Sequence, residues 1–148
     1  MLFLWVFGNN IEDRLGRLRF LPFYLACGAL AGLAQALSDP GSPIPLIGAS
    51  GAISGVLGAY LVLFPRVGVW TVVLPLVFLP FRLPAWLWLA IYFALQFLYL
   101  GDSATPGGGG VAYLAHIGGF IAGALLIRPF CLGRRPPPPP RPAIGPVY

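Results

Sequence analysis

The chain has 148 residues, of which 58% are hydrophobic and only 9% are charged. Soluble domains contain about 25% charged residues, so this composition excludes an ordinary soluble protein and is typical of an integral membrane protein. The formal net charge is +5, but the arginines that produce it are scattered between apolar runs, which argues against a nucleic-acid-binding protein.

The apolar runs predict an all-α, polytopic membrane bundle. A span needs ~20 apolar residues to cross ~30 Å of hydrocarbon, and only a helix pairs all of its own backbone groups there. Residues 1–8 form an apolar stub of ~12 Å, which is too short to cross a bilayer. After this stub we expect a charged turn at Glu12, Asp13 and Arg14. The expected spanning helices are residues 20–37, 48–64, 84–100 and 112–128.

Proline and glycine mark the segments between and after these spans. Residues 69–81 are apolar but interrupted by Pro75 and Pro80, so we expect an interfacial or re-entrant segment. Pro84 suits the first turn of the helix that follows, and four glycines at 107–110 predict a flexible loop. We divide the chain into a membrane domain, residues 1–130, and a Pro/Arg-rich tail, residues 131–148, whose proline run favours a stiff exposed end.

The charged residues predict the orientation of the bundle. When the spans are threaded alternately, all nine arginines fall on one side, whereas Asp39 and Asp102 fall on the other. By the positive-inside rule the arginine side is cytoplasmic. We therefore expect a multi-pass protein, in a bacterial cytoplasmic membrane, with a cytoplasmic C-terminal tail and an external glycine loop.

Ser50 and His116 are the candidate catalytic residues. His116 is the single histidine of the chain, and ionisable residues inside a membrane mark functional sites by default. Each of the two residues begins a glycine-rich helix, within about a turn of the same external end. A serine activated by a neighbouring imidazole is a nucleophile for acyl transfer.

Small residues on both helices predict a close approach between them. Gly51 and Gly55 are spaced four residues apart on one helix, as are Gly119 and Gly123 on the other, and such spacing lets membrane helices pack closely. Ser54 lies on the same small face as Gly55. These four glycines and Ser54 are the expected packing residues at the site.

The expected chemistry needs a dyad and an oxyanion site. No carboxylate is placed to act as a third catalytic member. The N–H of Ser50, at a helix start and with Gly48 and Gly51 as backbone support, is a natural oxyanion donor. Cys27 and Cys131 are interpreted as small apolar filler without a disulfide or metal role. A packing role alone for Ser50 and His116 stays open at this point.

Several motifs in order carry a resemblance to a known family. They are Gly48–Gly51 followed by Ala52–Gly55, Ala115–Gly119, Leu4–Gly8 leading to Glu12–Gly16, and Leu83–Trp86. From residue 1 to about 128, the chain resembles the rhomboid family of intramembrane serine proteases. The resemblance implies that Ser50 is the nucleophile and His116 the general base. It also implies that the substrates are transmembrane segments of membrane proteins, cleaved in the bilayer near its outer leaflet. By the same resemblance, no metal and no cofactor is expected.

The chain departs from the family pattern at its start. Relative to typical members, we expect it to lack the first helix and part of the second, including a His and an Asn that assist the oxyanion hole. Ser54 stands where some relatives place a tyrosine against the catalytic histidine. Two alternatives stay open: a catalytically inactive rhomboid-like protein that binds transmembrane clients, and a fragment of a small transporter.

Overall fold

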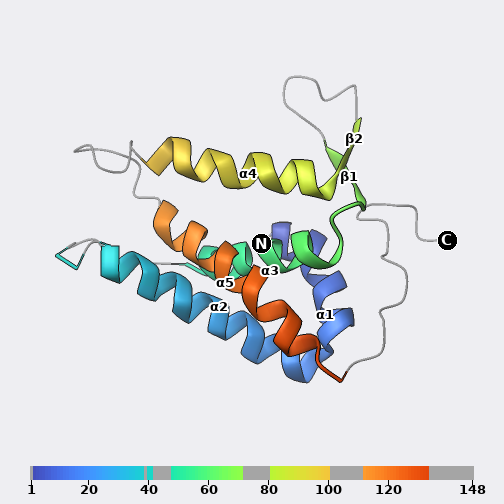
Figure 1. The fold of residues 1–148 in the computed structure, drawn as a ribbon, viewed down its shortest axis with the longest axis horizontal. Coiled ribbons are helices and arrows are strands. Elements are labelled where there is room, and N and C mark those ends of the chain that lie inside the picture. Colours follow the sequence, from blue (N-terminus) through green and yellow to red (C-terminus); the bar gives the residue numbers. More distant parts are fainter. Residues whose placement is uncertain (1, 39, 42–47, 72–80, 101–111, 134–148) are drawn as a thin grey trace.

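A computed structural model describes residues 2–38, 40–41, 48–71, 81–100 and 112–133 (Figure 1). Most of this part is helical. The helices are η1 (a π-helix, Leu4–Gly8), α1 (Asn9–Leu15), α2 (Arg17–Ser38), α3 (Ser50–Leu63), α4 (Ala85–Leu100) and α5 (Tyr113–Cys131). Two short strands, β1 (Gly68–Thr71) and β2 (Phe81–Pro84), pair antiparallel with Gly68 opposite Pro84. The expected helical bundle is confirmed.

The N-terminal segment corrects one prediction. Glu12, Asp13 and Arg14 belong to α1 rather than to a turn, because the helical pattern of buried residues continues through Ile11 and Leu15. The chain turns at Gly16 instead, where φ is 74°. Glycine adopts this conformation without the steric cost that a side chain would bring.

The region between α3 and α4 also differs from the sequence prediction. The two ends of residues 69–81 lie in β1 and β2, and residues 72–80 lie outside the described part. Pro84 ends β2, so α4 begins one residue later than expected. Backbone bonds explain this start, because the Ala85 N–H donates to the Val67 carbonyl at 2.7 Å and the Trp86 N–H to Pro65 at 2.9 Å. The 107–110 loop, residues 134–148, Asp39 and Asp102 lie outside the described residues.

Helix directions follow from contacts between distant residues. Nη1 of Arg19, near the start of α2, donates to the carbonyls of Phe130 and Leu132 at 3.1 and 2.8 Å, so α2 runs antiparallel to α5. Gly51 and Gly55 of α3 lie beside successive turns of α5, so α3 runs parallel to it. The most extensive helix contact is the one between α3 and α5.

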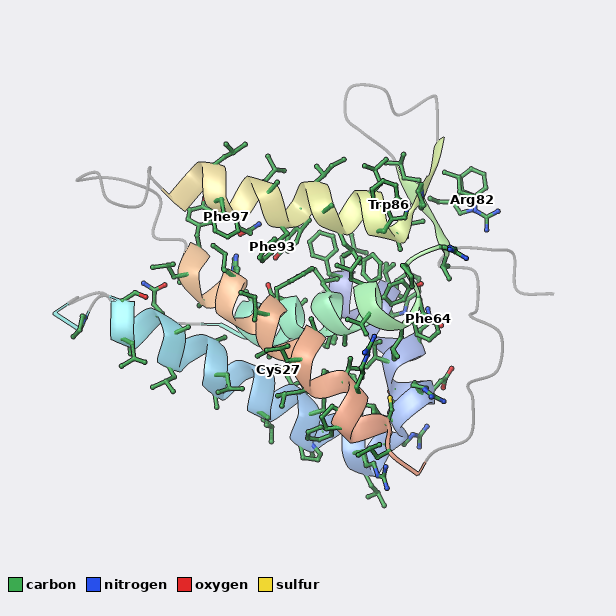
Figure 2. All side chains as sticks on the ribbon, viewed as in Figure 1. Cys27, Phe64, Arg82, Trp86, Phe93 and Phe97 are labelled. Carbon is green, nitrogen blue, oxygen red and sulfur yellow. The ribbon has the colours of Figure 1, made fainter. Side chains whose placement is uncertain are left out.

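Helix α4 packs against α3 and α5 on the side away from α2 (Figure 1). Aromatic side chains make much of this contact: the ring centroid of Phe93 lies 4.6 Å from that of Phe120 on α5, and Figure 2 shows Phe93 on the side of α4 that faces α5. Trp88 of α4 packs on Phe7 of η1 with centroids 5.7 Å apart. The buried core therefore joins the first helical segment to α4.

The helix surfaces suit a lipid environment. By length and composition, α2 and α5 could each cross a membrane, whereas α3 and residues Ala85–Leu98 are shorter apolar helices. Large apolar side chains point outward on α2, α4 and α5: Leu21, Leu25, Leu33, Ile91, Leu98 and Leu125 are all exposed. Exposed apolar surface of this extent marks a face that is covered by something other than water.

Candidate active site

Ser50 is the first residue of α3 and its side chain is exposed. The backbone enters the helix through Gly48, whose φ of 114° is a conformation that favours glycine. The first α-helical bond of this segment runs from the Ile53 N–H to the Ala49 carbonyl at 3.0 Å. The N–H groups of Ser50 and Gly51 therefore precede the intrahelical ladder and point away from the helix body.

A small cavity lies beside Ser50. Its volume is about 50 Å³, which is enough room for a water molecule. Its lining comes from three helices and from the turn before α3: Gly28, Ala31, Gly32, Gly48, Ala49, Ser50, Gly51, Ala52 and Ala115. Ala115 is the residue directly before His116, so the start of α5 reaches the cavity that Ser50 borders.

The small faces of α3 and α5 are in backbone contact. A Cβ atom on Gly119 would strike the carbonyl oxygen of Gly51, and one on Gly123 would strike that of Gly55. A Cβ on Gly55 would lie only 2.5 Å from the Cβ of Cys27 on α2 and 3.1 Å from the Gly119 carbonyl oxygen on α5. Three helices thus meet at glycines below the start of α3, and this contact aligns the starts of α3 and α5.

Ser54 belongs to a polar contact that sequence reasoning did not foresee. Its side chain is fully buried, and its Oγ lies 2.9 Å from the hydroxyl oxygen of Tyr92 on α4. The hydroxyl that stands one turn below Ser50 therefore links α3 to α4.

His116 lies in the first turns of α5 and is half-buried. Its Nδ1 is 2.8 Å from Oε1 of Gln96 on α4. Beside it, the Ala115 N–H donates to Oε1 of Gln35 on α2 at 3.3 Å. The start of α5 is therefore held by a glutamine on each side.

The structure brings the surroundings of Ser50 and His116 together without joining the two side chains. Ser50 borders a cavity shared with Ala115, and Gly51 touches Gly119. Within the described residues, the imidazole bonds to Gln96 and no hydrogen bond connects it to the Ser50 hydroxyl. The same part of the chain contains no cluster of three or more His, Cys, Asp or Glu side chains that could hold a metal ion.

Known proteins share extensive sequence with this chain. The model of the Rhomboid domain matches residues 1–133. The chain belongs to the rhomboid family. It is 32% identical over 130 residues to "Rhomboid protein 1, mitochondrial" of Saccharomyces cerevisiae, an alignment covering 84% of this chain and 35% of that protein. It is 47% identical over 60 residues to "Rhomboid protease GluP" of Bacillus subtilis, covering 40% of this chain and 11% of the relative.

The alignments cover only part of the length of each relative. The aligned part of this rhomboid chain covers about a third of the length of the yeast protein and about a tenth of the length of the Bacillus protein. No solved structure gives a significant match. Family membership identifies an integral membrane protein and supports an intramembrane protease-like function.

Gln35 and Gln96 were missed by the sequence reasoning. They are the only glutamines in the chain, and each stands inside an apolar helix of this rhomboid. A glutamine within an apolar run does indicate a polar contact, because a polar side chain in a membrane span usually has a polar partner inside the bundle. The identity of that partner was not readable from spacing, since Gln35 and Ala115 are 80 residues apart and Gln96 and His116 are 20 apart.

Proposed function

We propose that this rhomboid is a serine endopeptidase that cleaves transmembrane segments of membrane proteins, with Ser50 as nucleophile and His116 as general base. The observation that carries the proposal is the meeting of the two helix starts, where Ser50 and the residue before His116 border one cavity. The family match to a protease by name supports the reaction class. Neither a metal nor a cofactor takes part in the proposed chemistry.

The proposed reaction is acyl transfer in two stages. The Ser50 oxygen forms a bond to the carbonyl carbon of the substrate while its proton passes to His116. The N–H groups of Ser50 and Gly51, turned outward by the backbone at Gly48, stabilise the developing oxyanion. His116 then gives its proton to the leaving amine as the peptide C–N bond breaks. Water attacks the acyl-enzyme in the same way and releases Ser50.

The proposed orientation places this chemistry near the outer leaflet. Arg19, Arg66, Arg82 and Arg128 lie near the helix ends opposite to Ser50 and His116. Arginine-rich ends face the cytoplasm by the positive-inside rule. The proposal is therefore a multi-pass protein of a bacterial cytoplasmic membrane, with the tail cytoplasmic and the site open to water and to lateral transmembrane substrates.

A second candidate is an inactive rhomboid-like protein that binds transmembrane clients. One observation favours it, namely the lack of a direct hydrogen bond between Ser50 and His116 within the described residues. If His116 does not reach the Ser50 hydroxyl when a substrate is bound, the serine is not activated, and the protein binds the substrate without cleaving it. The two candidates differ in whether a bound transmembrane segment is cut.

Proteoliposomes containing the chain and a tagged transmembrane substrate separate the two candidates. The protease proposal expects cleavage products from the wild type. It expects at least a roughly 10³-fold lower rate for Ser50→Ala, which removes the nucleophile, and a roughly 10²–10⁴-fold lower rate for His116→Ala, which removes the general base. Co-purification of the substrate with the wild type, without cleavage, would support the client-binding candidate instead. Cleavage at the same rate in Ser50→Ala would overturn the assignment of the nucleophile.

A further inference from the structure

The amide of Gln96 is fixed in one orientation by its own helix. Gln96 is 8% exposed, and its Nε2 donates to the backbone carbonyl of Tyr92, one turn earlier in α4, at 3.2 Å. A carbonyl oxygen only accepts hydrogen bonds, so the NH₂ group must be the side of the amide that faces Tyr92. The Oε1 atom is thereby directed at His116.

This orientation determines which nitrogen of His116 carries the proton. Oε1 of Gln96 lies 2.8 Å from Nδ1 of His116, and an amide oxygen is an acceptor only. The neutral imidazole must therefore carry its hydrogen on Nδ1, which leaves the lone pair on Nε2. A base that receives a proton from Ser50 needs such an unprotonated nitrogen.

We propose that Gln96 is a positioning residue that holds His116 in the Nδ1–H tautomer, with Nε2 free to accept the proton of Ser50. The inference rests on the proposed function in one respect, the role of His116 as the base. Gln96 does not touch substrate in this scheme and acts through the imidazole alone. It occupies the place that a carboxylate takes in a Ser-His-Asp triad.

A neutral amide suits this place in the membrane. Burying a charged carboxylate in apolar surroundings is costly, whereas a glutamine whose NH₂ and oxygen both have partners is buried without an unpaired polar group. The amide fixes the tautomer and the ring orientation by hydrogen bonding, but it adds no negative charge beside the imidazolium. We expect its contribution to the rate to be correspondingly smaller than that of the aspartate in a triad.

The single histidine makes the tautomer directly measurable. The full chain with ¹⁵N-labelled histidine, in nanodiscs at a pH where the imidazole is neutral, gives long-range ¹H–¹⁵N signals from one ring only, because the chain has one His. The expected result for the wild type is a protonated Nδ1 and an unprotonated Nε2. In Gln96→Leu the proton should redistribute toward Nε2, the nitrogen that an isolated imidazole prefers.

Tyr92→Phe is the matched control. It removes the hydroxyl bonded to Ser54, so α4 also loses one hydrogen bond to the core, but the backbone carbonyl that orients Gln96 remains. This variant should keep the wild-type tautomer. A wild-type ring protonated on Nε2, or the same tautomer in wild type and Gln96→Leu, would overturn the positioning role.

The protease assay separates this inference from the proposed function. Gln96→Leu should lower kcat by roughly 10-fold, which is less than the ~10²–10⁴ expected for loss of the general base itself. If the wild type cleaves the substrate and Gln96→Leu has the same rate and the same tautomer, the positioning role is overturned and the protease function stands. An Nδ1–H tautomer that depends on Gln96, in a chain that cleaves nothing, would support the positioning of the ring and overturn the protease function.

Discussion

Gly123 of α5 lies so close to Gly55 of α3 that a Cβ atom on Gly123 would strike the Gly55 carbonyl oxygen. The helix approach here excludes any side chain larger than hydrogen. Because the same parallel contact continues to Gly51 and Gly119, it sets the relative depth of the two helix starts. The relative positions of Ser50 and His116 therefore depend on glycines that lie within about two turns of them.

Gly123→Ala should destabilise the fold and abolish activity without changing either reactive residue. The methyl group must push the backbones apart, and overpacking of this kind costs about 1–3 kcal/mol. Thermal unfolding in detergent should show a lower Tm than the wild type. Gly41→Ala is the control, since a Cβ there meets nothing within 4 Å. Equal Tm and activity in the two variants would contradict the backbone contact.

The Ser54–Tyr92 contact should appear as an interaction energy between α3 and α4. The two oxygens are 2.9 Å apart, and a hydrogen bond of this kind contributes about 0.5–1.5 kcal/mol. A double-mutant cycle with Ser54→Ala and Tyr92→Phe, measured by unfolding in denaturing detergent, isolates the coupling. Additive effects of the two substitutions would mean that the hydroxyls do not interact.

Arg19 should stabilise the bundle more than its neighbour Arg17. Both arginines are exposed, but Arg19 donates to two carbonyls, those of Phe130 and Leu132 at the end of α5, and each such hydrogen bond contributes about 0.5–1.5 kcal/mol. Arg17 pairs with Glu12 at 3.4 Å but its side chain is 92% exposed, and exposed ion pairs contribute about 0–1 kcal/mol. The free energy of unfolding should therefore fall further for Arg19→Ala than for Arg17→Ala. The reverse order would argue against the hydrogen bonds between Arg19 of α2 and the end of α5.

The proposed orientation predicts which end of the bundle an impermeant thiol reagent reaches. In a Cys131→Ser background, Gly41→Cys should be labelled in intact cells, and Leu132→Cys should be labelled only after lysis. Both positions are exposed, and the remaining Cys27 is fully buried. Labelling of Leu132→Cys but not Gly41→Cys in intact cells would place Ser50 and His116 at the cytoplasmic face.

The sequence predicted the helices well because hydrocarbon leaves few alternatives. Apolar runs must pair their own backbone groups, so the helices now described as α2, α3, α4 and α5 could be placed within a few residues. The charged residues Glu12 to Arg14 predict a turn by composition, and this prediction is wrong because charge alone does not end a helix. The actual stop is Gly16, whose positive φ ends α1.

The polar partners of the site were beyond sequence reasoning. That Ser54 bonds to Tyr92, and His116 to Gln96, depends on how α4 rotates against α3 and α5. This rotation is decided by aromatic packing such as Phe93 on Phe120, which no periodicity in α4 reveals. The backbone contacts of Gly119 and Gly123 are easier to predict. Small residues spaced four apart line one face of a helix, and such a face allows close packing whichever helix lies against it.

The central claim is that His116 activates Ser50 as a nucleophile. A fluorophosphonate probe tests this most directly, because it forms a P–O bond with an activated serine and releases fluoride. Mass spectrometry of the treated chain in nanodiscs should locate the adduct on Ser50, at a rate roughly 10²–10⁴-fold lower in His116→Ala. Absence of an adduct on Ser50 in the wild type, or labelling at the same rate in His116→Ala, would contradict the account.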